Sequence, residues 1–234
     1  TSWWLIFFFC DTTSLVKKNL YFKNVRVLIW DFDGTLYKPN KMLFDAVRQA
    51  EYRTIMDHTG WPKERVVEEF KKLHTIVYPS ATEVTAVLCK ISISQAAVEM
   101  ERYFDRRDYL TRDEKLIELF AKLKRFAHFT LANGIRKRHE ETLDVLGVPR
   151  ETFEEMVTSE VVGVTKPHLD GFRHILKKTG LPPREHLMIG DREAVDIMPA
   201  KKLGLKTCLV WSGKKSTIAD VTLPNVYQVA ELFS

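Results

Sequence analysis

The sequence predicts an α/β fold, in which a doubly wound parallel sheet carries a block of helices inserted after its first strand. The segment VRVLIW at residues 25–30 is almost entirely apolar and rich in β-branched residues, as expected of a strand covered on both faces. Apolar residues then recur at helical spacing over residues 40–105. From residue 111 onward, short strand-like runs alternate with helical patterns, which is typical of βαβ units in a parallel sheet.

Residues 38–110 are predicted to form an inserted helical cap domain. Breakers such as Gly60-Trp61-Pro62 divide this region into helical stretches, and no strand-like alternation stands out between them. The expected helices span residues 40–58, 62–74, 80–89 and 92–105. The region therefore reads as a small helical bundle placed inside another domain.

Residues 23–37 and 111–234 are predicted to form the α/β core. The TRDE motif predicts a capping box, with Thr111 as the N-cap of a helix reaching about residue 125 and Glu114 as its partner. The other expected elements are strands at 126–132, 156–159, 186–190 and 205–211, and helices at 135–146, 169–179 and 194–203.

The composition is that of a globular protein with one large or two small domains. The 234 residues are 45% hydrophobic and 29% charged, with a net charge of +5. The 36 basic and 31 acidic residues are interspersed, so no nucleic-acid partner is expected. The basic run IRKRH at 135–139 is expected to be the solvated first turn of a helix.

Residues 1–22 are predicted to be a tail that is non-native or loosely ordered. Its apolar run from Trp3 to Cys10 is shorter than the roughly 17–25 residues of a membrane helix, and it lacks the features of a signal peptide. No membrane partner is expected, and a peripheral membrane anchor is the alternative interpretation of this tail. The cysteines have no metal-ligand spacing, and Cys89 and Cys208 are expected in the core of a cytoplasmic protein.

Polar residues that can carry chemistry follow the predicted core strands. Since the carboxyl ends of parallel strands lie at one edge of a sheet, these residues should lie close together. They are Asp31, Asp33, Asn133, Gly134, Lys166, Asp191 and Asp196. Clustered carboxylates without His or Cys ligands favour Mg²⁺, which is commonly bound together with substrate phosphate. A lysine beside them would offset the charge of a phosphoryl group.

The motif DFDG at 31–34 has competing interpretations that the sequence disfavours. Asp-Gly is a strong hairpin signal, but helices rather than a partner strand follow it. A calcium-binding EF-hand loop would need Glu at its twelfth position, where Met42 stands. The P-loop, dinucleotide-binding and GxSxG motifs are absent from the sequence.

Three motifs in this order resemble those of the haloacid dehalogenase-like (HAD) superfamily of phosphohydrolases, over about residues 25–213. They are WDFDGTL at 30–36, TKP at 165–167 and GDREAVD at 190–196. The resemblance implies a Rossmann-like core with a helical C1-type cap and a Mg²⁺ cofactor. It also implies an aspartyl-phosphate intermediate.

The resemblance also assigns roles to single residues. It implies Asp31 as the nucleophile and Asp33 as the acid/base, with both binding the metal, Asp33 through its backbone carbonyl. Lys166 would hold the phosphate and the nucleophile, Asp191 would bind the metal and Asp196 would support the site. The expected phosphate-binding residues are Gly34, Thr35, Asn133, Gly134 and Lys166.

One position departs from the family pattern. The second motif normally ends its strand in Ser or Thr, whose hydroxyl binds the phosphate, but this chain has Ala132 in TLANG. The backbone N–H of Asn133 can still donate, whereas Thr130, two residues earlier, would have to reach further. Losing one hydrogen bond to a charged group costs about 1.5–3 kcal/mol, which predicts a slower or more selective enzyme.

The motifs leave several functions open. The favoured hypothesis is a Mg²⁺-dependent phosphatase acting on a small phosphorylated metabolite, as a monomer or homodimer. A phosphomutase of the same superfamily would use the same residues. A phosphate-ester-binding or regulatory protein without turnover is the third alternative, which only Ala132 favours.

Overall fold

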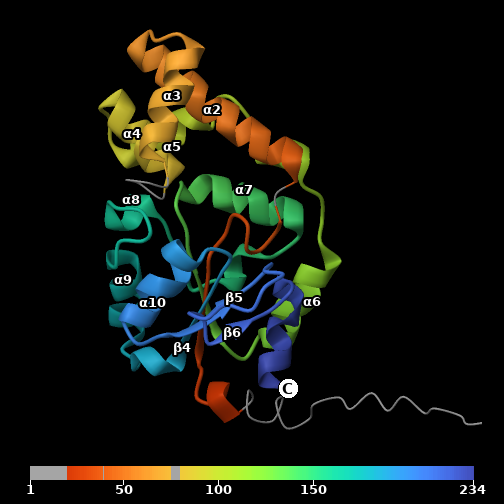
Figure 1. Ribbon diagram of the computed structural model, residues 1–234. Coiled ribbons are helices and arrows are strands. Elements are labelled where there is room, and N and C mark those ends of the chain that lie inside the picture. Colours follow the sequence, from red (N-terminus) through yellow and green to blue (C-terminus); the bar gives the residue numbers. More distant parts are fainter. Residues whose placement is uncertain (1–19, 39, 75–79) are drawn as a thin grey trace, which may run out of the picture.

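The computed structural model describes residues 20–38, 40–74 and 80–234. Within these ranges, six parallel strands form one sheet in the order β3-β2-β1-β4-β5-β6 (Figure 1). They are β1 (Val27–Trp30), β2 (Ala127–Leu131), β3 (Glu155–Val157), β4 (His186–Gly190), β5 (Lys206–Leu209) and β6 (Val221–Thr222). The order reverses between β1 and β4, so the doubly wound parallel sheet that the sequence predicts is confirmed. The strand β6 was not expected, because two residues are too few for a periodic pattern.

The helices surround this sheet and extend above it. They are α2 (Lys41–Thr59), α3 (Lys63–Leu73), α4 (Ala81–Cys89), α5 (Ile93–Met100), α6 (Glu114–Leu123), α7 (Arg136–Leu146), α8 (Ser159–Val162), α9 (Asp170–Thr179) and α10 (Met198–Lys202). Shorter 3₁₀ turns are η1 (Arg106–Tyr109), η2 (Arg150–Thr152), η3 (Pro183–Glu185) and η5 (Val226–Phe233), and η4 (Glu193–Ile197) is a π-helical turn.

Both faces of the sheet are buried, which explains the unbroken apolar run of β1. Leu28 and Trp30 pack in a core with residues of α6, α7 and η5. Val27 and Ile29 point the other way, into a core with residues of α9 and α10. The indole N–H of the fully buried Trp30 donates to Nδ1 of His128 on β2 at 3.1 Å, so its polar atom is satisfied.

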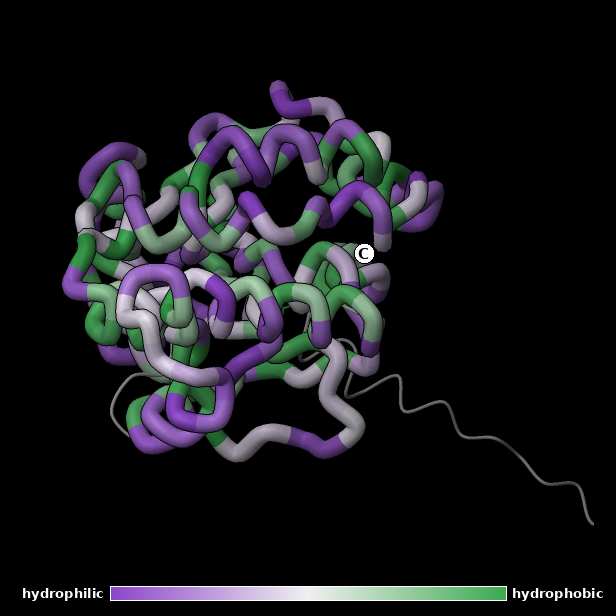
Figure 2. Tube along the Cα trace, turned by 90° about the horizontal axis from the view of Figure 1, so that it is seen from above, coloured by the Kyte–Doolittle hydropathy of each residue, from purple (hydrophilic) through white to green (hydrophobic). Residues whose placement is uncertain are grey.

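Helices α2 to α5 lie beyond the carboxyl ends of the strands, above α7 in Figure 1. They enclose a hydrophobic cluster of their own, formed by Tyr52, Ile55, Val66, Phe70, Val84 and Cys89. Seen from above in Figure 2, hydrophilic and hydrophobic residues alternate along the outer helices, as in amphipathic helices packed on one side. The separate cluster agrees with a cap, and its boundaries at residues 38 and 110 stay a prediction.

Two local details differ from the expectations. The N-cap of α6 is Asp113, whose Oδ1 accepts from the N–H of Leu116 at 3.1 Å, so the predicted capping by Thr111 is wrong. Aspartate caps a helix as well as threonine does, and the apolar residues of α6 are buried in the core. The helix expected at 194–203 begins as the π-turn η4, because Pro199 has no N–H for the regular ladder.

Cys89 and Cys208 are buried free thiols, as expected. Over the described ranges, no helix is both long and apolar enough to span a bilayer. The predicted tail lies, for residues 1–19, outside the described residues.

Candidate active site

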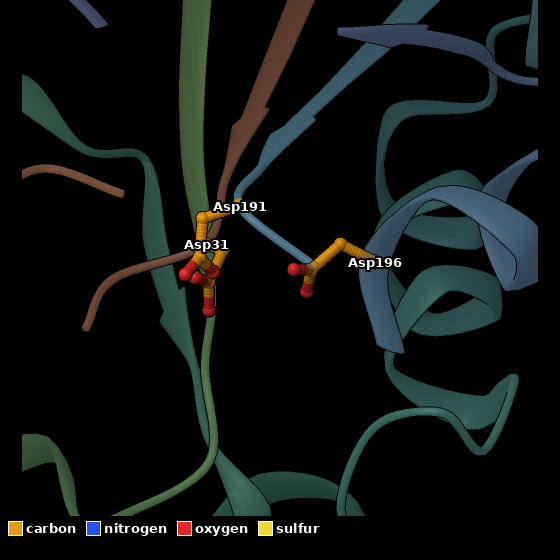
Figure 3. A group of neighbouring side chains, drawn as sticks. All are labelled: Asp31, Asp191 and Asp196. Atoms are coloured by element: carbon orange, nitrogen blue, oxygen red, sulfur yellow. The ribbon is translucent and has the colours of Figure 1, made fainter. Parts of the chain in front are cut away.

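The site forms where the strand order reverses. Asp31 follows β1 and its N–H donates to the carbonyl of Ile189 at 2.9 Å, while Asp191 follows the neighbouring strand β4. Figure 3 shows the side chains of Asp31 and Asp191 close together, with that of Asp196 opposite them. Each contributes an oxygen that lies within 4.8 Å of the other two. Three of the four carboxylates predicted to lie at this edge of the sheet therefore form one cluster.

Lys166 links two of these carboxylates. Its Nζ lies 2.5 Å from Oδ1 of Asp31 and 2.6 Å from Oδ1 of Asp196, and the residue is only 3% exposed. Burial alone would favour a neutral amine, but the charges of Asp196 and Asp31 outweigh it and raise the pKa of Lys166. The lysine is therefore a buried cation that pairs with two of the three clustered carboxylates.

The loop after β1 orients Asp31 and brings the chain close to Asp191. The hydroxyl of Thr35 donates to Oδ2 of Asp31 at 2.8 Å, so this buried side chain orients the carboxylate. Gly34 has a φ of +90°, and a Cβ there would lie 2.6 Å from Oδ2 of Asp191. Only glycine fits both conditions, because other residues are strained at this φ and would collide with the carboxylate. A direct contact of either residue with phosphate stays a prediction.

Asp196 lies in the π-turn η4 and is completely buried. Its Oδ2 accepts a hydrogen bond from the backbone N–H of Arg192 at 3.1 Å. A Cβ added to Gly190 would lie 2.5 Å from the Cβ of Asp196, so only glycine leaves room for this side chain. Burial and the charge of Asp31 raise the pKa of Asp196, against the opposing effect of Lys166. Both oxygens of Asp196 are occupied by protein donors, so this residue fits the supporting role better than that of a metal ligand.

Asp191 has a buried carboxylate oxygen that is free to bind a further ligand. Its buried Oδ1 accepts no hydrogen bond from the described residues, and the nearest cation there is Nε of Arg192 at 3.8 Å. Burial, together with the charges of Asp31 and Asp196, raises the pKa of Asp191 to about 7. An unpaired buried oxygen among all-oxygen donors suits a hard divalent cation, so Asp31 and Asp191 fit a Mg²⁺ ion.

The carboxylate of Asp33 has two partners outside the acidic cluster. The hydroxyl of Tyr37 donates to its Oδ1, and Nε and Nη2 of Arg106 lie 3.4 Å from Oδ1 and Oδ2 respectively. Burial opposes ionisation, but the charge of Arg106 and the hydrogen bond from Tyr37 hold the pKa of Asp33 below its usual value. Neither Tyr37 nor Arg106 belongs to a motif, so the sequence pattern does not point to either residue.

The Asn133-Gly134 turn after β2 connects to the lysine loop. The backbone N–H of Lys166 donates to Oδ1 of Asn133 at 2.8 Å, and the Gly134 carbonyl accepts from the Ser159 hydroxyl at 3.0 Å. The side chain of Asn133 therefore positions the segment that carries Lys166. A contact of Asn133 or Gly134 with phosphate stays a prediction.

Ala132 and Thr130 lie on one face of β2, but they are not equivalent. Ala132 packs in the core at the end of the strand, whereas Thr130 pairs with Trp30 inside the sheet and is fully buried. The Thr130 hydroxyl has no hydrogen-bond partner within the described ranges. Because Thr130 lies beside Trp30 within the sheet, and not beside the loop that follows β1, its hydroxyl is too far inside the sheet to replace the missing one.

His139 contradicts the expected solvated turn at 135–139. It is 1% exposed, and its ring stacks on the ring of Phe32, with the centroids 4.3 Å apart. Phe32 is the residue between the two aspartates of the first motif in the sequence. Burial lowers the pKa of His139 to about 4, so the ring is neutral at physiological pH. The helical period places Ile135 and His139, four residues apart, inward, while Arg136 and Lys137 are exposed.

Comparisons with known proteins agree with this architecture. The family model described as haloacid dehalogenase-like hydrolase matches residues 25–204. A glyceraldehyde 3-phosphate phosphatase of Methanocaldococcus jannaschii is 29% identical, over 84% of this chain and 89% of the relative. Pyrophosphatase PpaX of Bacillus cereus is 23% identical, over 86% and 90% of the two chains.

Solved structures share the fold at low identity. A HAD phosphatase from Thermococcus onnurineus matches with a TM-score of 0.67 and 18% identity, over 90% of this chain and 98% of the other. A 2-haloacid dehalogenase from Pseudomonas syringae matches with a TM-score of 0.59 and 17% identity, over 89% and 97%. Because proteins of different chemistry share this fold, the reaction has to be argued from the side chains.

Proposed function

Because this chain belongs to the haloacid dehalogenase-like hydrolase family, we propose that it is a Mg²⁺-dependent phosphatase acting on a small phosphorylated metabolite. The observation that carries the proposal is the arrangement around Asp31. A buried lysine lies 2.5 Å from one of its oxygens, a threonine hydroxyl binds the other, and Asp191 lies beside it. A carboxylate oriented in this way is equipped to attack phosphorus, and its positive neighbour offsets the charge of the phosphoryl group.

The proposed reaction has two steps. An oxygen of Asp31 forms a bond to phosphorus while the bond to the leaving oxygen breaks, and Asp33 gives that oxygen a proton. Because the charge of Arg106 holds the pKa of Asp33 low, Asp33 can hold this proton only once the substrate has displaced Arg106 from it. A water molecule then attacks phosphorus, and the bond between phosphorus and the Asp31 oxygen breaks. Asp33 takes a proton of the water, phosphate leaves and the Asp31 carboxylate is restored. Lys166 stabilises the negative charge in both steps. A Mg²⁺ ion held by Asp31, Asp191 and the backbone carbonyl of Asp33 would supply further charge neutralisation.

Asp33 separates phosphoryl transfer from dehalogenation. A halide leaving group needs no proton, whereas an alkoxide leaving from phosphorus does, so an acid/base two residues after the nucleophile supports a phosphatase. The relatives named for small anionic substrates support a small phosphorylated substrate for this chain as well. The cap helices α2 to α5 would exclude bulk water above the site.

The proposal is tested by phosphate release from an aryl phosphate, with Mg²⁺ and with excess EDTA. We expect activity to require the metal and Asp31→Asn to lower kcat by about 1,000-fold or more. Asp45→Asn is the matched control, because Asp45 is an exposed residue of α2 that pairs only with Lys41 among the described contacts. Full activity of Asp31→Asn would contradict the mechanism.

A panel of nucleotides, sugar phosphates, three-carbon phosphoesters and pyrophosphate then identifies the substrate. Isomer formation without free phosphate would favour a phosphomutase. Tight binding of phosphate analogues without any product would favour a binding protein, the alternative that Ala132 supports.

A further inference from the structure

Arg106 is a cap-side cation that reaches the proposed acid/base. It lies in η1, between the cap helix α5 and the core helix α6, and is 73 residues from Asp33 in the chain. Its Nε and Nη2 lie 3.4 Å from Oδ1 and Oδ2 of Asp33, so the planar guanidinium faces both oxygens of the carboxylate.

The surroundings of Arg106 hold it toward the site rather than toward solvent. Its side chain is 13% exposed, and Nη1 pairs with Oε1 of Glu101 at the end of α5. The guanidinium also lies over the ring of Phe104, 5.1 Å from the centroid. Glu101 is shared with Arg138 of α7, whose Nε lies 3.8 Å from Oε2. This network spans cap and core and leaves the guanidinium fork directed at Asp33.

The position of Arg106 has a consequence for the substrate. In the proposed reaction Asp33 hydrogen-bonds the leaving oxygen, so a guanidinium 3.4 Å from Asp33 lies next to the leaving group. We propose that Arg106 is a specificity-determining residue that binds an oxygen acceptor on the leaving group. The favoured substrates are phosphomonoesters with a carboxylate or hydroxyl next to the ester carbon. This inference rests on the proposed function and deepens it.

The geometry favours oxygen acceptors over other groups. Arginine presents several N–H donors in a fixed plane, which suits carboxylates and vicinal oxygens better than apolar substituents. A substrate acceptor would replace Asp33 as the partner of two of these donors, which frees the Asp33 carboxyl to face the leaving oxygen. An apolar leaving group cannot compete with Asp33 for the guanidinium, so the ion pair between Arg106 and Asp33 stays formed.

Three esters of similar size test this inference: carboxymethyl phosphate, 2-hydroxyethyl phosphate and ethyl phosphate. We expect the wild type to prefer carboxymethyl over ethyl phosphate by about 10-fold or more in kcat/KM, with 2-hydroxyethyl phosphate between them. In Arg106→Gln the preference should shrink to about 3-fold or less, and Arg106→Lys should retain part of it.

Arg107→Gln is the matched control, because the neighbouring Arg107 is exposed and pairs only with Asp105 among the described ion pairs. It should keep the wild-type order and spread of the three rates. A purely structural role of Arg106 would slow all three esters by the same factor and leave their ratio unchanged, which would overturn the inference. Equal rates of the three esters in the wild type would overturn it as well.

A binding measurement separates this inference from the proposed function. If the wild type hydrolyses none of the esters, nor an aryl phosphate, the proposed function fails. Calorimetric binding of the same three esters in the presence of Mg²⁺ then decides the role of Arg106. Tighter binding of carboxymethyl than of ethyl phosphate, lost in Arg106→Gln but kept in Arg107→Gln, would support it. Equal binding of the two esters would overturn it. Thermal unfolding confirms that each variant is folded.

Discussion

The Nζ atom of Lys166 lies 2.5 Å from Oδ1 of Asp31, although the two residues are 135 positions apart in the chain. The same ammonium lies 2.6 Å from Oδ1 of the fully buried Asp196. One cation therefore compensates two buried carboxylates, one proposed to react and one that supports the loop after β4. Its removal should affect catalysis and stability separately.

Lys166→Met is expected to lower kcat by about 100-fold or more, because the charge opposite the phosphoryl group is lost. It should also lower the free energy of unfolding by about 3 kcal/mol, since buried Asp196 is left unpaired. The double variant Lys166→Met/Asp196→Asn should recover most of the stability but none of the activity.

Denaturant unfolding measures the change in stability, and phosphate release measures the change in activity. Lys177→Met, at an exposed position of α9, is the control. An active single variant would contradict the role of Lys166.

Gly34→Ala should abolish activity while leaving the protein folded. The variant places a Cβ 2.6 Å from Oδ2 of Asp191, which displaces a proposed metal ligand. Gly180→Ala is the matched control, because Gly180 has a φ of +63° but nothing within 4 Å of its added Cβ. Both variants should lose about 1 kcal/mol of stability from the left-handed backbone. Only Gly34→Ala should lose Mg²⁺ affinity, which calorimetry measures. Equal activity of the two variants would rule out this steric role.

Ala132→Ser restores the hydroxyl that the family pattern places after the second strand. We expect kcat/KM to rise by about 10-fold, the equivalent of one hydrogen bond to a charged phosphate. Ala127→Ser, at the other end of β2, should leave kcat/KM unchanged. Steady-state kinetics on one phosphomonoester distinguishes the two variants. An unchanged or lower kcat/KM in Ala132→Ser would mean that the site binds phosphate without this hydroxyl.

Thr130→Val should stabilise the protein by about 1 kcal/mol and leave its activity unchanged. The buried Thr130 hydroxyl finds no partner among the described residues, and valine fills nearly the same space without an unsatisfied polar atom. Thermal and denaturant unfolding measure the gain. A loss of phosphate affinity instead would show that Thr130 reaches the substrate and replaces the hydroxyl that Ala132 lacks.

The buried Glu51 of α2 should make the stability of the protein depend on pH. It lies in α2 with 3% exposure, and burial raises its pKa from 4.5 to about 7, although Nη1 of Arg48 lies 2.8 Å from Oε2. Between these two values the folded protein holds a proton that the unfolded chain has released. The contribution of Glu51 is therefore fully present below pH 4.5 and is lost as the pH rises through 7.

Glu51→Gln should remove this contribution to the pH dependence. The stability of the wild type relative to the variant should fall by up to about 3 kcal/mol between pH 4.5 and pH 8. Denaturant unfolding across this range measures the difference, and comparison with the variant cancels the other titrating groups. Glu68→Gln, at an exposed position of α3, should follow the wild type. Parallel curves for wild type and Glu51→Gln would show that Glu51 does not titrate in this window.

Much of the fold could be predicted from local pattern. The run VRVLIW is apolar on both sides because β1 is buried on both sides, and glycines such as Gly60 and Gly147 end helices in the left-handed conformation. The capping by Asp113 and the π-turn at 193–197 do not follow from local pattern. Each involves a choice between neighbouring hydrogen-bond partners of similar strength, and packing against the core decides between them. The two residues of β6 carry no periodicity at all.

In the site, the residues that follow each strand could be identified without the structure, because parallel strands bring their carboxyl ends to one edge of the sheet. Asp31, Asp191, Asp196 and Lys166 are close for that reason. The partners that come from other segments depend on how the folded chain packs. Arg106 meets Asp33, Asn133 holds the segment of Lys166, and His139 turns inward onto Phe32. Such contacts join segments far apart in the chain, and local sequence pattern does not encode them until the sheet and the cap have packed together.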